Sequence, residues 1–155
     1  MVTKRNFIKQ FWKDRQMVGA VSPSTRFLGE KMVENIDFEK ARLIIELGPG
    51  TGVFTDIIIT RMHPEAKLLV LELNDNFFES LNNRIIDPRV EVLHESAEFI
   101  DKHLKNNEKV DAVVSSLPLM VFPEKLRMDV VKAAHDVLKK GGNYMQFQYS
   151  LQSKK

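Results

Sequence analysis

Short apolar runs alternate with stretches of helical periodicity along most of the chain. The apolar runs predict strands at 43–47, 68–73, 90–93, 110–114 and 144–147. The intervening patterns predict helices near 52–62, 76–85, 97–105 and 123–139. Apolar residues fill consecutive positions in runs such as Leu43-Ile44-Ile45, which is typical of strands that helices cover on both faces. The pattern predicts an α/β fold with a mainly parallel sheet, right-handed crossovers and helices on both faces.

Proline and glycine mark the expected ends of the last helix. Pro123 stands where a first helical turn tolerates proline, and Gly141-Gly142 follows Lys139-Lys140 as a helix stop should. We therefore expect this helix to end near residue 139.

The composition is that of one soluble globular domain. Of the 155 residues, 43% are hydrophobic and 28% are charged, which allows a sizeable core. No apolar run approaches the roughly eighteen residues of a membrane span, and no signal-peptide pattern opens the chain, so we expect a cytoplasmic location. The chain has no Cys, and its four His lack the spacing of a zinc-binding helix, so we expect no metal.

Basic residues are concentrated at the N-terminus. Residues 1–31 hold seven Lys or Arg against two acidic residues, although the net charge of the chain is only +2, too small to indicate a nucleic-acid partner. Four large apolar residues follow helical spacing there: Phe7, Ile8, Phe11 and Trp12. We expect a basic amphipathic helix over 1–18, followed by a second region at 19–155. Residues 4–18 can bind an anionic membrane surface, at about 1 kcal/mol per cation, or cover the domain's own sheet.

The loop after the first predicted strand carries the strongest chemical signal. It reads Glu46-Leu47-Gly48-Pro49-Gly50-Thr51-Gly52 and leads into a predicted helix. Glycines let the backbone turn sharply and approach a ligand closely, because a Cβ would occupy the ligand's space. The G-x-G-x-G spacing differs from the G-x-G-x-x-G of pyrophosphate sites, and Glu46 would repel an anion. A sulfonium cofactor with a free amino group therefore fits better than NAD. The predicted cofactor contacts are Glu46, Gly48, Pro49, Gly50, Thr51 and Gly52.

Three other strand ends complete the predicted site. Glu72, about twenty residues after the last glycine, can accept hydrogen bonds from both ribose hydroxyls, each contributing about 1.5–3 kcal/mol, with Leu73 beside it. Ser96 and Ala97 follow the third strand, where an adenine would lie, although Ser96 suits a helix N-cap equally well. Ser115 follows the fourth strand and is a further predicted cofactor contact on the side where an acceptor would sit.

These motifs resemble class I S-adenosylmethionine (SAM)-dependent methyltransferases over residues 42–149. Three segments are also similar to bacterial phospholipid N-methyltransferases, namely GAVSPSTRFLGEKM (19–32), SSLPLM (115–120) and QFQYS (146–150). The resemblance implies a Rossmann-like fold, SAM as methyl donor and S-adenosylhomocysteine as product. It further implies stepwise methylation of the phosphatidylethanolamine headgroup by an enzyme that is peripheral on the inner membrane face.

The resemblance also implies an acceptor site after the fourth strand. Its predicted catalytic positions are Ser115, Ser116, Pro118 and Tyr149, which would align a neutral amine with the methyl group. The enzyme would then contribute mainly alignment and exclusion of water. No strong general base is evident, and His94 and Tyr149 are the candidates.

Two alternatives stay open. The rRNA adenine dimethylases share the glycine loop, but they carry an Asn and an aromatic residue after the fourth strand, near the places of Ser115 or Ser116 and Leu119 here. In addition, the chain ends soon after Ser150 and lacks the C-terminal antiparallel hairpin of a full domain. We therefore expect either a homodimer through the open sheet edge or a C-terminally short domain that binds SAM without turnover.

Overall fold

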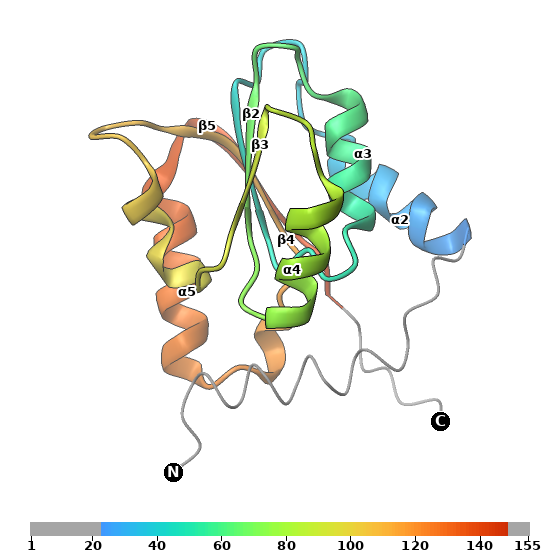
Figure 1. Cartoon of the computed structure of the whole chain (residues 1–155). Coiled ribbons are helices and arrows are strands. Elements are labelled where there is room, and N and C mark those ends of the chain that lie inside the picture. Colours follow the sequence, from blue (N-terminus) through green and yellow to red (C-terminus); the bar gives the residue numbers. More distant parts are fainter. Residues whose placement is uncertain (1–22, 149–155) are drawn as a thin grey trace, which may run out of the picture.

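The predicted strands form one sheet, shown in Figure 1. The structure is a computed structural model that describes residues 23–148. Its strands are β1 (Leu43–Leu47), β2 (Lys67–Leu71), β3 (Val90–Leu93), β4 (Val110–Ser115) and β5 (Leu138–Gln146). Its α-helices are α2 (Pro23–Val33), α3 (Val53–Arg61), α4 (Asp75–Arg84) and α5 (Glu124–Val137), and its 3₁₀ helices are η2 (Ala97–His103) and η3 (Leu119–Val121). The expected helix over 1–18 and the predicted site residue Tyr149 lie outside the described residues.

Every strand pairing in this sheet is parallel. The strand order is β3-β2-β1-β4-β5, so the order reverses between β1 and β4. Leu47 at the end of β1 pairs with Leu71 of β2 and with Ser115 of β4, which aligns three carboxyl ends at one edge. In open α/β sheets, ligands bind at this edge, beside the point of reversal. The predicted Rossmann-like α/β fold is confirmed, and residues 23–148 contain no antiparallel strand pair.

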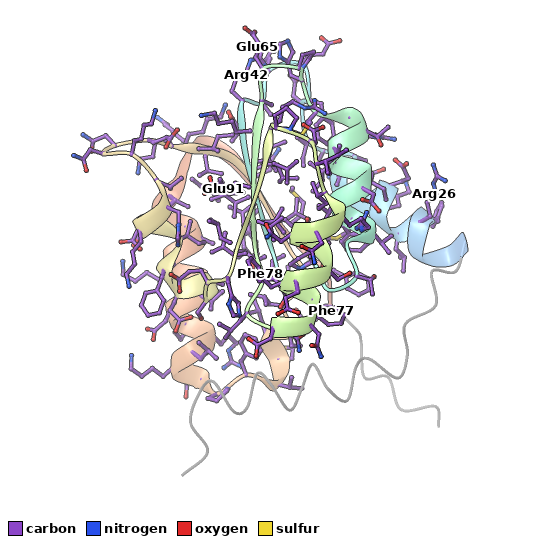
Figure 2. The ribbon with its side chains drawn as sticks, in the orientation of Figure 1. Arg26, Arg42, Glu65, Phe77, Phe78 and Glu91 are labelled. Carbon is purple, nitrogen blue, oxygen red and sulfur yellow. The ribbon has the colours of Figure 1, made fainter. Side chains whose placement is uncertain are left out.

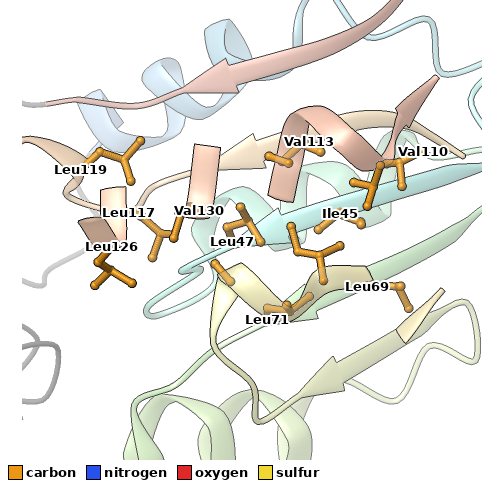
Figure 3. Close-up of a cluster of buried hydrophobic side chains, with 14 of the residues drawn as sticks. Ile45, Leu47, Leu69, Leu71, Val110, Val113, Leu117, Leu119, Leu126 and Val130 are labelled. Atoms are coloured by element: carbon orange, nitrogen blue, oxygen red, sulfur yellow. The ribbon is translucent and has the colours of Figure 1, made fainter. Parts of the chain in front are cut away.

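Helices cover both faces of the sheet, and side chains alternate between the faces along β1. Ile45 and Leu47 belong to the cluster under η2 and α5, whereas Ile44 belongs to the cluster under α2 and α3. Figure 1 shows α5 on one side of the sheet and α2 with α3 on the other. Figure 3 shows the first cluster, in which sheet residues meet Leu126 and Val130 of α5. Fully burying a large apolar side chain stabilises the fold by about 1.5–3 kcal/mol. Because β1 is buried along its whole length, it holds the start of the following loop in a fixed position.

The start of β5 departs from the prediction. Helix α5 ends at Val137 rather than near 139, and β5 begins at Leu138 rather than at 144. The prediction that Gly141-Gly142 stops the helix is therefore wrong, because both glycines lie within β5.

A register shift explains this irregular beginning. The pairing of β4 with β5 shifts between Val110 and Ala112, and Gly141 takes a φ of 78°, which favours glycine. Lys139 forms an ion pair with Asp111, whose carboxylate also accepts the backbone N–H groups of residues 42 and 43. These contacts keep the extra residues attached to β4, so the chain continues as strand.

Other boundary differences are small. Strand β2 ends at Leu71 rather than at 73, and the helix expected over 97–105 is a 3₁₀ helix that ends at His103 and is interrupted at Phe99. Within residues 23–148, no helix has both the length and the apolar character needed to cross a bilayer.

Candidate active site

The glycine loop turns through three positive backbone angles. Gly48, Gly50 and Gly52 have φ values of 66°, 60° and 91°, a region that residues with a Cβ rarely adopt. Gly52 also lies against α4, because a Cβ there would come within 2.6 Å of Leu81 Cδ2 and 2.5 Å of Arg84 Nη2. The turn and its packing therefore require glycine.

Glu72 joins this loop to the end of β2. Its carboxylate is buried and accepts hydrogen bonds from the N–H of Gly50 at 3.1 Å and the N–H of Asn74 at 2.8 Å. The Asn74 side chain accepts in turn from Phe77 N–H and caps α4. Hydrogen bonds to a charged group contribute about 1.5–3 kcal/mol each. Glu72 thus fixes the loop and the start of α4 at the same time.

Glu46 is a fully buried carboxyl on the face of β1 toward α3. Thr55 donates a hydrogen bond to its Oε2 at 2.5 Å, and Oε1 has no hydrogen-bond partner among the described residues. Burial disfavours the ionised form and raises the pKa of Glu46 to about 8, against the opposing effect of Thr55 and with a smaller contribution from Glu72. A buried oxygen without a hydrogen-bond partner costs about 1–3 kcal/mol. A cationic group of a ligand could supply the missing partner of Oε1.

A small pocket, partly open to solvent, lies beside Glu72. It is lined by Gly48, Leu71, Glu72, Leu73, Glu95, Ser96, Ala97, Glu98, Leu117, Phe122, Leu126 and Val130. The predicted cofactor contacts among them are Gly48, Glu72, Leu73, Ser96 and Ala97. The predicted contacts outside this lining are Glu46, Pro49, Gly50, Thr51, Gly52 and Ser115. The structure therefore brings five of the predicted cofactor contacts together in one pocket, and the other six lie outside its lining.

Sequence reasoning missed the apolar wall of this pocket. Phe122, Leu126 and Val130 are buried, and they come from the end of η3 and from α5. Their i, i+4 spacing marks the inward face of a helix, which predicts core packing as readily as a ligand wall. Only their position just after the β4 loop, at the carboxyl edge of the sheet, could have singled them out.

Two polar side chains that line the pocket after β3 form hydrogen bonds with their neighbours. Glu95 accepts a hydrogen bond from Ser96 N–H at 2.9 Å and lies 3.3 Å from His103 Nε2. Burial opposes ionisation of Glu95, but these hydrogen bonds outweigh it and hold the pKa of Glu95 below its usual range. The Ser96 hydroxyl donates to the carboxylate of Glu98 in η2 and forms no hydrogen bond with the backbone N–H groups at the start of that helix.

The loop after β4 is held between two strands. Ser116 N–H donates to the Leu47 carbonyl of β1 at 3.0 Å, and Phe147 N–H donates to the Ser115 carbonyl at 2.8 Å. Both serines are buried, and Pro118 directly precedes η3. Three of the four predicted catalytic positions therefore lie in one loop at the carboxyl edge of the sheet.

The sequence of residues 44–142 matches a family of methyltransferase domains. The chain is also 32% identical over 143 residues to an ornithine lipid N-methyltransferase from Singulisphaera acidiphila, covering 90% of this chain and 74% of that protein. The chain belongs to the SAM-dependent methyltransferase family. SAM is accordingly its methyl donor.

Two further similarities place this methyltransferase among its relatives. It is 27% identical over 116 residues to ribosomal RNA small subunit methyltransferase A from Borrelia garinii, covering 72% of this chain and 40% of that protein. The chain thus spans less than half the length of that relative. A SAM-dependent methyltransferase from Clostridium acetobutylicum superposes with a TM-score of 0.60 at 17% identity, covering 93% of this chain and 57% of that chain, which shows the shared fold.

The candidate site lies at one end of the sheet. In Figure 2, Phe77 and Phe78 on α4 mark the end that carries the site, whereas Arg42 and Glu65, which precede β1 and β2, mark the opposite end. This is the edge that the parallel strand order indicates for a ligand.

The candidate base His94 and the more distant His135 differ in surroundings. The His94 ring stacks on Phe78 with ring centroids 4.7 Å apart, and its Nε2 lies 3.1 Å from the Leu73 carbonyl and 3.0 Å from an Asp75 oxygen. His94 is therefore engaged with α4 and the end of β2. His135 lies on the surface of α5 with 86% of its side chain exposed.

Proposed function

We propose that this methyltransferase transfers methyl groups to the primary amine of a membrane lipid headgroup. The observation that carries the proposal is the similarity to an ornithine lipid N-methyltransferase, which extends over 90% of this chain. Phosphatidylethanolamine and ornithine lipids both present a primary amine, so they share the reacting group. Phosphatidylethanolamine remains the acceptor expected from the sequence motifs, and the experiment below separates the two.

The loop after β4 supports an amine acceptor over a nucleic-acid base. It reads Ser115-Ser116-Leu117-Pro118-Leu119, so it contains neither a carboxamide to accept a proton from an adenine amine nor an aromatic ring to stack on a flipped base. The pocket beside this loop has an apolar wall formed by Phe122, Leu126 and Val130. Such a wall excludes water from the reacting centre.

The electrostatics of the pocket support the proposed placement of the cofactor. Its lining residues include Glu72, Glu95 and Glu98 but neither Lys nor Arg, which favours a cationic ligand. Glu72 would hold the ribose hydroxyls, Ser96 and Ala97 would lie beside the adenine, and Glu46 Oε1 would hold the ammonium group. The glycine loop would follow the amino-acid part of the cofactor closely.

The chemistry that remains for the protein is alignment. SAM supplies a methyl group that its positive sulfur already activates. The lone pair of the lipid amine forms a bond to the methyl carbon while the carbon–sulfur bond breaks, its electrons stay on sulfur, and the product ammonium loses a proton to solvent. Ser115, Ser116 and Pro118 would orient the amine in line with this bond, an effect worth several kcal/mol of the barrier, up to about 7–11 in ideal cases. His94 Nε2 already contacts Leu73 and Asp75, so we assign it no role as a base.

The test supplies labelled SAM to the purified full chain with three kinds of vesicle. One contains phosphatidylethanolamine, one an ornithine lipid, and one only phosphatidylcholine, which lacks a primary amine. We expect label in lipid from one or both of the first two and none from the third. Glu72→Ala should be inactive, and Glu79→Ala, at an exposed position of α4, should be active. A parallel reaction supplies small-subunit rRNA in place of vesicles, and label in the rRNA but in no lipid would establish base methylation instead. Binding of SAM without any methylated product would indicate a domain that binds the cofactor without turnover.

A second arm tests membrane attachment. We propose that residues 4–18 bring the site to an anionic membrane surface, because their basic and aromatic residues suit such a surface. Removing residues 1–18 should weaken sedimentation with anionic vesicles and leave SAM affinity unchanged. Equal sedimentation with and without the segment would contradict this part.

A further inference from the structure

Four residues at the junction of β4 and β5 form a nearly closed ring, in which hydrogen bonds make three of the links. Leu117 N–H donates to Ser115 Oγ at 3.3 Å, and the Ser115 hydroxyl is a neighbour of the Tyr144 hydroxyl, whose pKa it lowers. Tyr144 O–H donates to Gln146 Oε1 at 2.6 Å, and Gln146 Nε2 donates back to the Leu117 carbonyl at 2.7 Å. Three hydrogen bonds therefore link the four residues, and neighbouring hydrogen bonds in such a network strengthen one another.

The ring is shielded from water. Ser115 is fully buried, Leu117 is buried, and Tyr144 and Gln146 are half-buried. Burial raises the pKa of the Tyr144 hydroxyl, against the opposing hydrogen bond from Ser115, so the group stays a neutral donor. A buried polar group that loses its partner is destabilised more than an exposed one, so the members of the ring depend on one another.

The ring controls the backbone of the proposed acceptor loop. It binds both polar groups of Leu117, the N–H and the carbonyl, and Leu117 lines the pocket. The next residue is Pro118, whose fixed φ transmits the orientation of Leu117 to the start of η3. Among the described residues, no hydrogen bond joins the ring to the glycine loop or to Glu72, so we expect its main effect on the loop after β4 rather than on the carboxylate that would hold the cofactor.

We propose that Tyr144 and Gln146 are positioning residues that set the backbone of Leu117 and Pro118 for the acceptor. The inference rests on the proposed function only in naming this loop as the acceptor side. Neither residue touches the reacting atoms. Their effect reaches the reaction through the peptide groups on both sides of Leu117.

The test compares Tyr144→Phe, Gln146→Leu and the double variant. Each single variant should lower kcat for the lipid amine about tenfold, the equivalent of one hydrogen bond, and should leave SAM affinity unchanged. Because the ring acts as one unit, the double variant should be no slower than the slower single variant. Multiplying losses in the double variant, or a parallel loss of SAM affinity, would overturn the proposal.

A matched control lies on the same strand. Asn143 Nδ2 donates to the Asn35 carbonyl at 2.9 Å, which is the same kind of bond outside the ring. Asn143→Ala should lower the melting temperature about as much as Gln146→Leu does, while its kcat stays at the wild-type value. If Asn143→Ala lowered kcat as much as Gln146→Leu, a general weakening of β5 would explain both.

The variant Gln146→Glu adds a pH readout. A carboxylate at this position can accept from Tyr144 but repels the Leu117 carbonyl, whereas the protonated acid can donate to it. Activity relative to the wild type should therefore rise as the pH falls. A ratio that does not change with pH would count against the ring.

One readout does not depend on the acceptor. Amide hydrogen exchange in 116–122 should be faster in Tyr144→Phe and Gln146→Leu than in the wild type, and unchanged in Asn143→Ala. If the wild type methylated no lipid, the proposed function would fail, and the exchange rates would still decide whether the ring holds the loop. Unchanged exchange in the ring variants would refute the ring.

Discussion

The two sides of the site are built from different interactions. On the side of β1 and β2, the buried groups are the ionisable carboxyls Glu46 and Glu72. On the side of β4 and β5, the polar side chains are neutral: Ser115 is buried, and Tyr144 and Gln146 are half-buried. Carboxyls suit recognition of a cationic ligand, whereas a neutral ring fixes geometry without attracting charge. Affinity for the cofactor and alignment of the acceptor should therefore respond to different substitutions.

The largest expected effect is that of Glu72→Ala on cofactor binding. The substitution removes the carboxylate that binds the N–H groups of Gly50 and Asn74 and that would also hold the ribose. We expect SAM affinity to fall about 100-fold or more, because each lost charge-assisted bond is worth about 1.5–3 kcal/mol. Calorimetric titration with SAM and S-adenosylhomocysteine measures the loss, with Glu79→Ala as control. Wild-type affinity in the variant would break the assignment of the cofactor to this side.

Gly52→Ala should have the next largest effect, and this effect should be on the stability of the fold. The new Cβ would meet Leu81 and Arg84 at a φ of 91°. We expect the free energy of unfolding to fall by about 2–4 kcal/mol, the sum of overpacking and backbone strain.

The control for this prediction is Gly141→Ala, where φ is 78° and nothing lies within 4 Å. Only backbone strain applies there, so about 1 kcal/mol is expected. Urea unfolding of both variants measures the two values. Equal losses would show that packing against α4 does not constrain the glycine loop.

Glu46→Gln should remove a pH dependence. The pKa of Glu46 is about 8 in the folded chain and 4.5 in the reference state, so wild-type stability should fall as pH rises from 4.5 toward 8, and the variant should lack this fall. The affinity for SAM should change with pH in the opposite direction. A bound ammonium favours the carboxylate and releases a proton, so wild-type SAM affinity should rise by up to about tenfold per pH unit between about pH 6 and about pH 7.5.

Calorimetry in buffers of different ionisation enthalpy measures this proton release directly. Identical pH slopes for the wild type and Glu46→Gln would show that Glu46 does not meet the ammonium group. Tyr144→Phe should keep the wild-type slope, which sharpens the contrast between the two sides.

Arg84→Gln should have the smallest effect. Its guanidinium pairs with Asp56 at 2.8 Å and donates to the Thr51 carbonyl at 3.2 Å, so it links α4 to α3 and the glycine loop. Both ionic side chains are about half exposed, and pairs of this kind contribute at most about 1 kcal/mol. Urea unfolding at low and high salt should show a small loss that salt removes. A loss as large as that of Gly52→Ala would mean that this link is part of the cofactor support.

The fold around the proposed cofactor side could be predicted from the sequence because its signals are local. The strand bounds at 43–47 and 90–93 agree with β1 and β3, and Glu72 lies at the end of β2 as expected. A run of apolar residues followed by a glycine loop specifies strand, turn and helix within a dozen positions. The parallel order then brings the strand ends together.

The acceptor side could not be predicted because its interactions are not local. The bond from Gln146 to Leu117 joins residues 29 positions apart, and it depends on a β4–β5 register that a shift near Val110 sets. Gly141 in that shifted segment was predicted to stop a helix, which hid the true start of β5. Sequence periodicity gives the existence of a strand but not its register with a neighbour.

The ring of hydrogen bonds has a consequence for protein engineering. A designer who grafts the 115–121 segment of another methyltransferase onto this scaffold should transplant residues 144 and 146 with it. Gln146 binds the Leu117 carbonyl and Tyr144 binds Gln146, so these two positions fix the backbone shape of the segment. The contact with β1 imposes no such demand, because it joins two backbone atoms, Ser116 N–H and the Leu47 carbonyl. The unit of exchange for a new acceptor is therefore the loop together with two positions of β5, while the donor side of the scaffold can be kept.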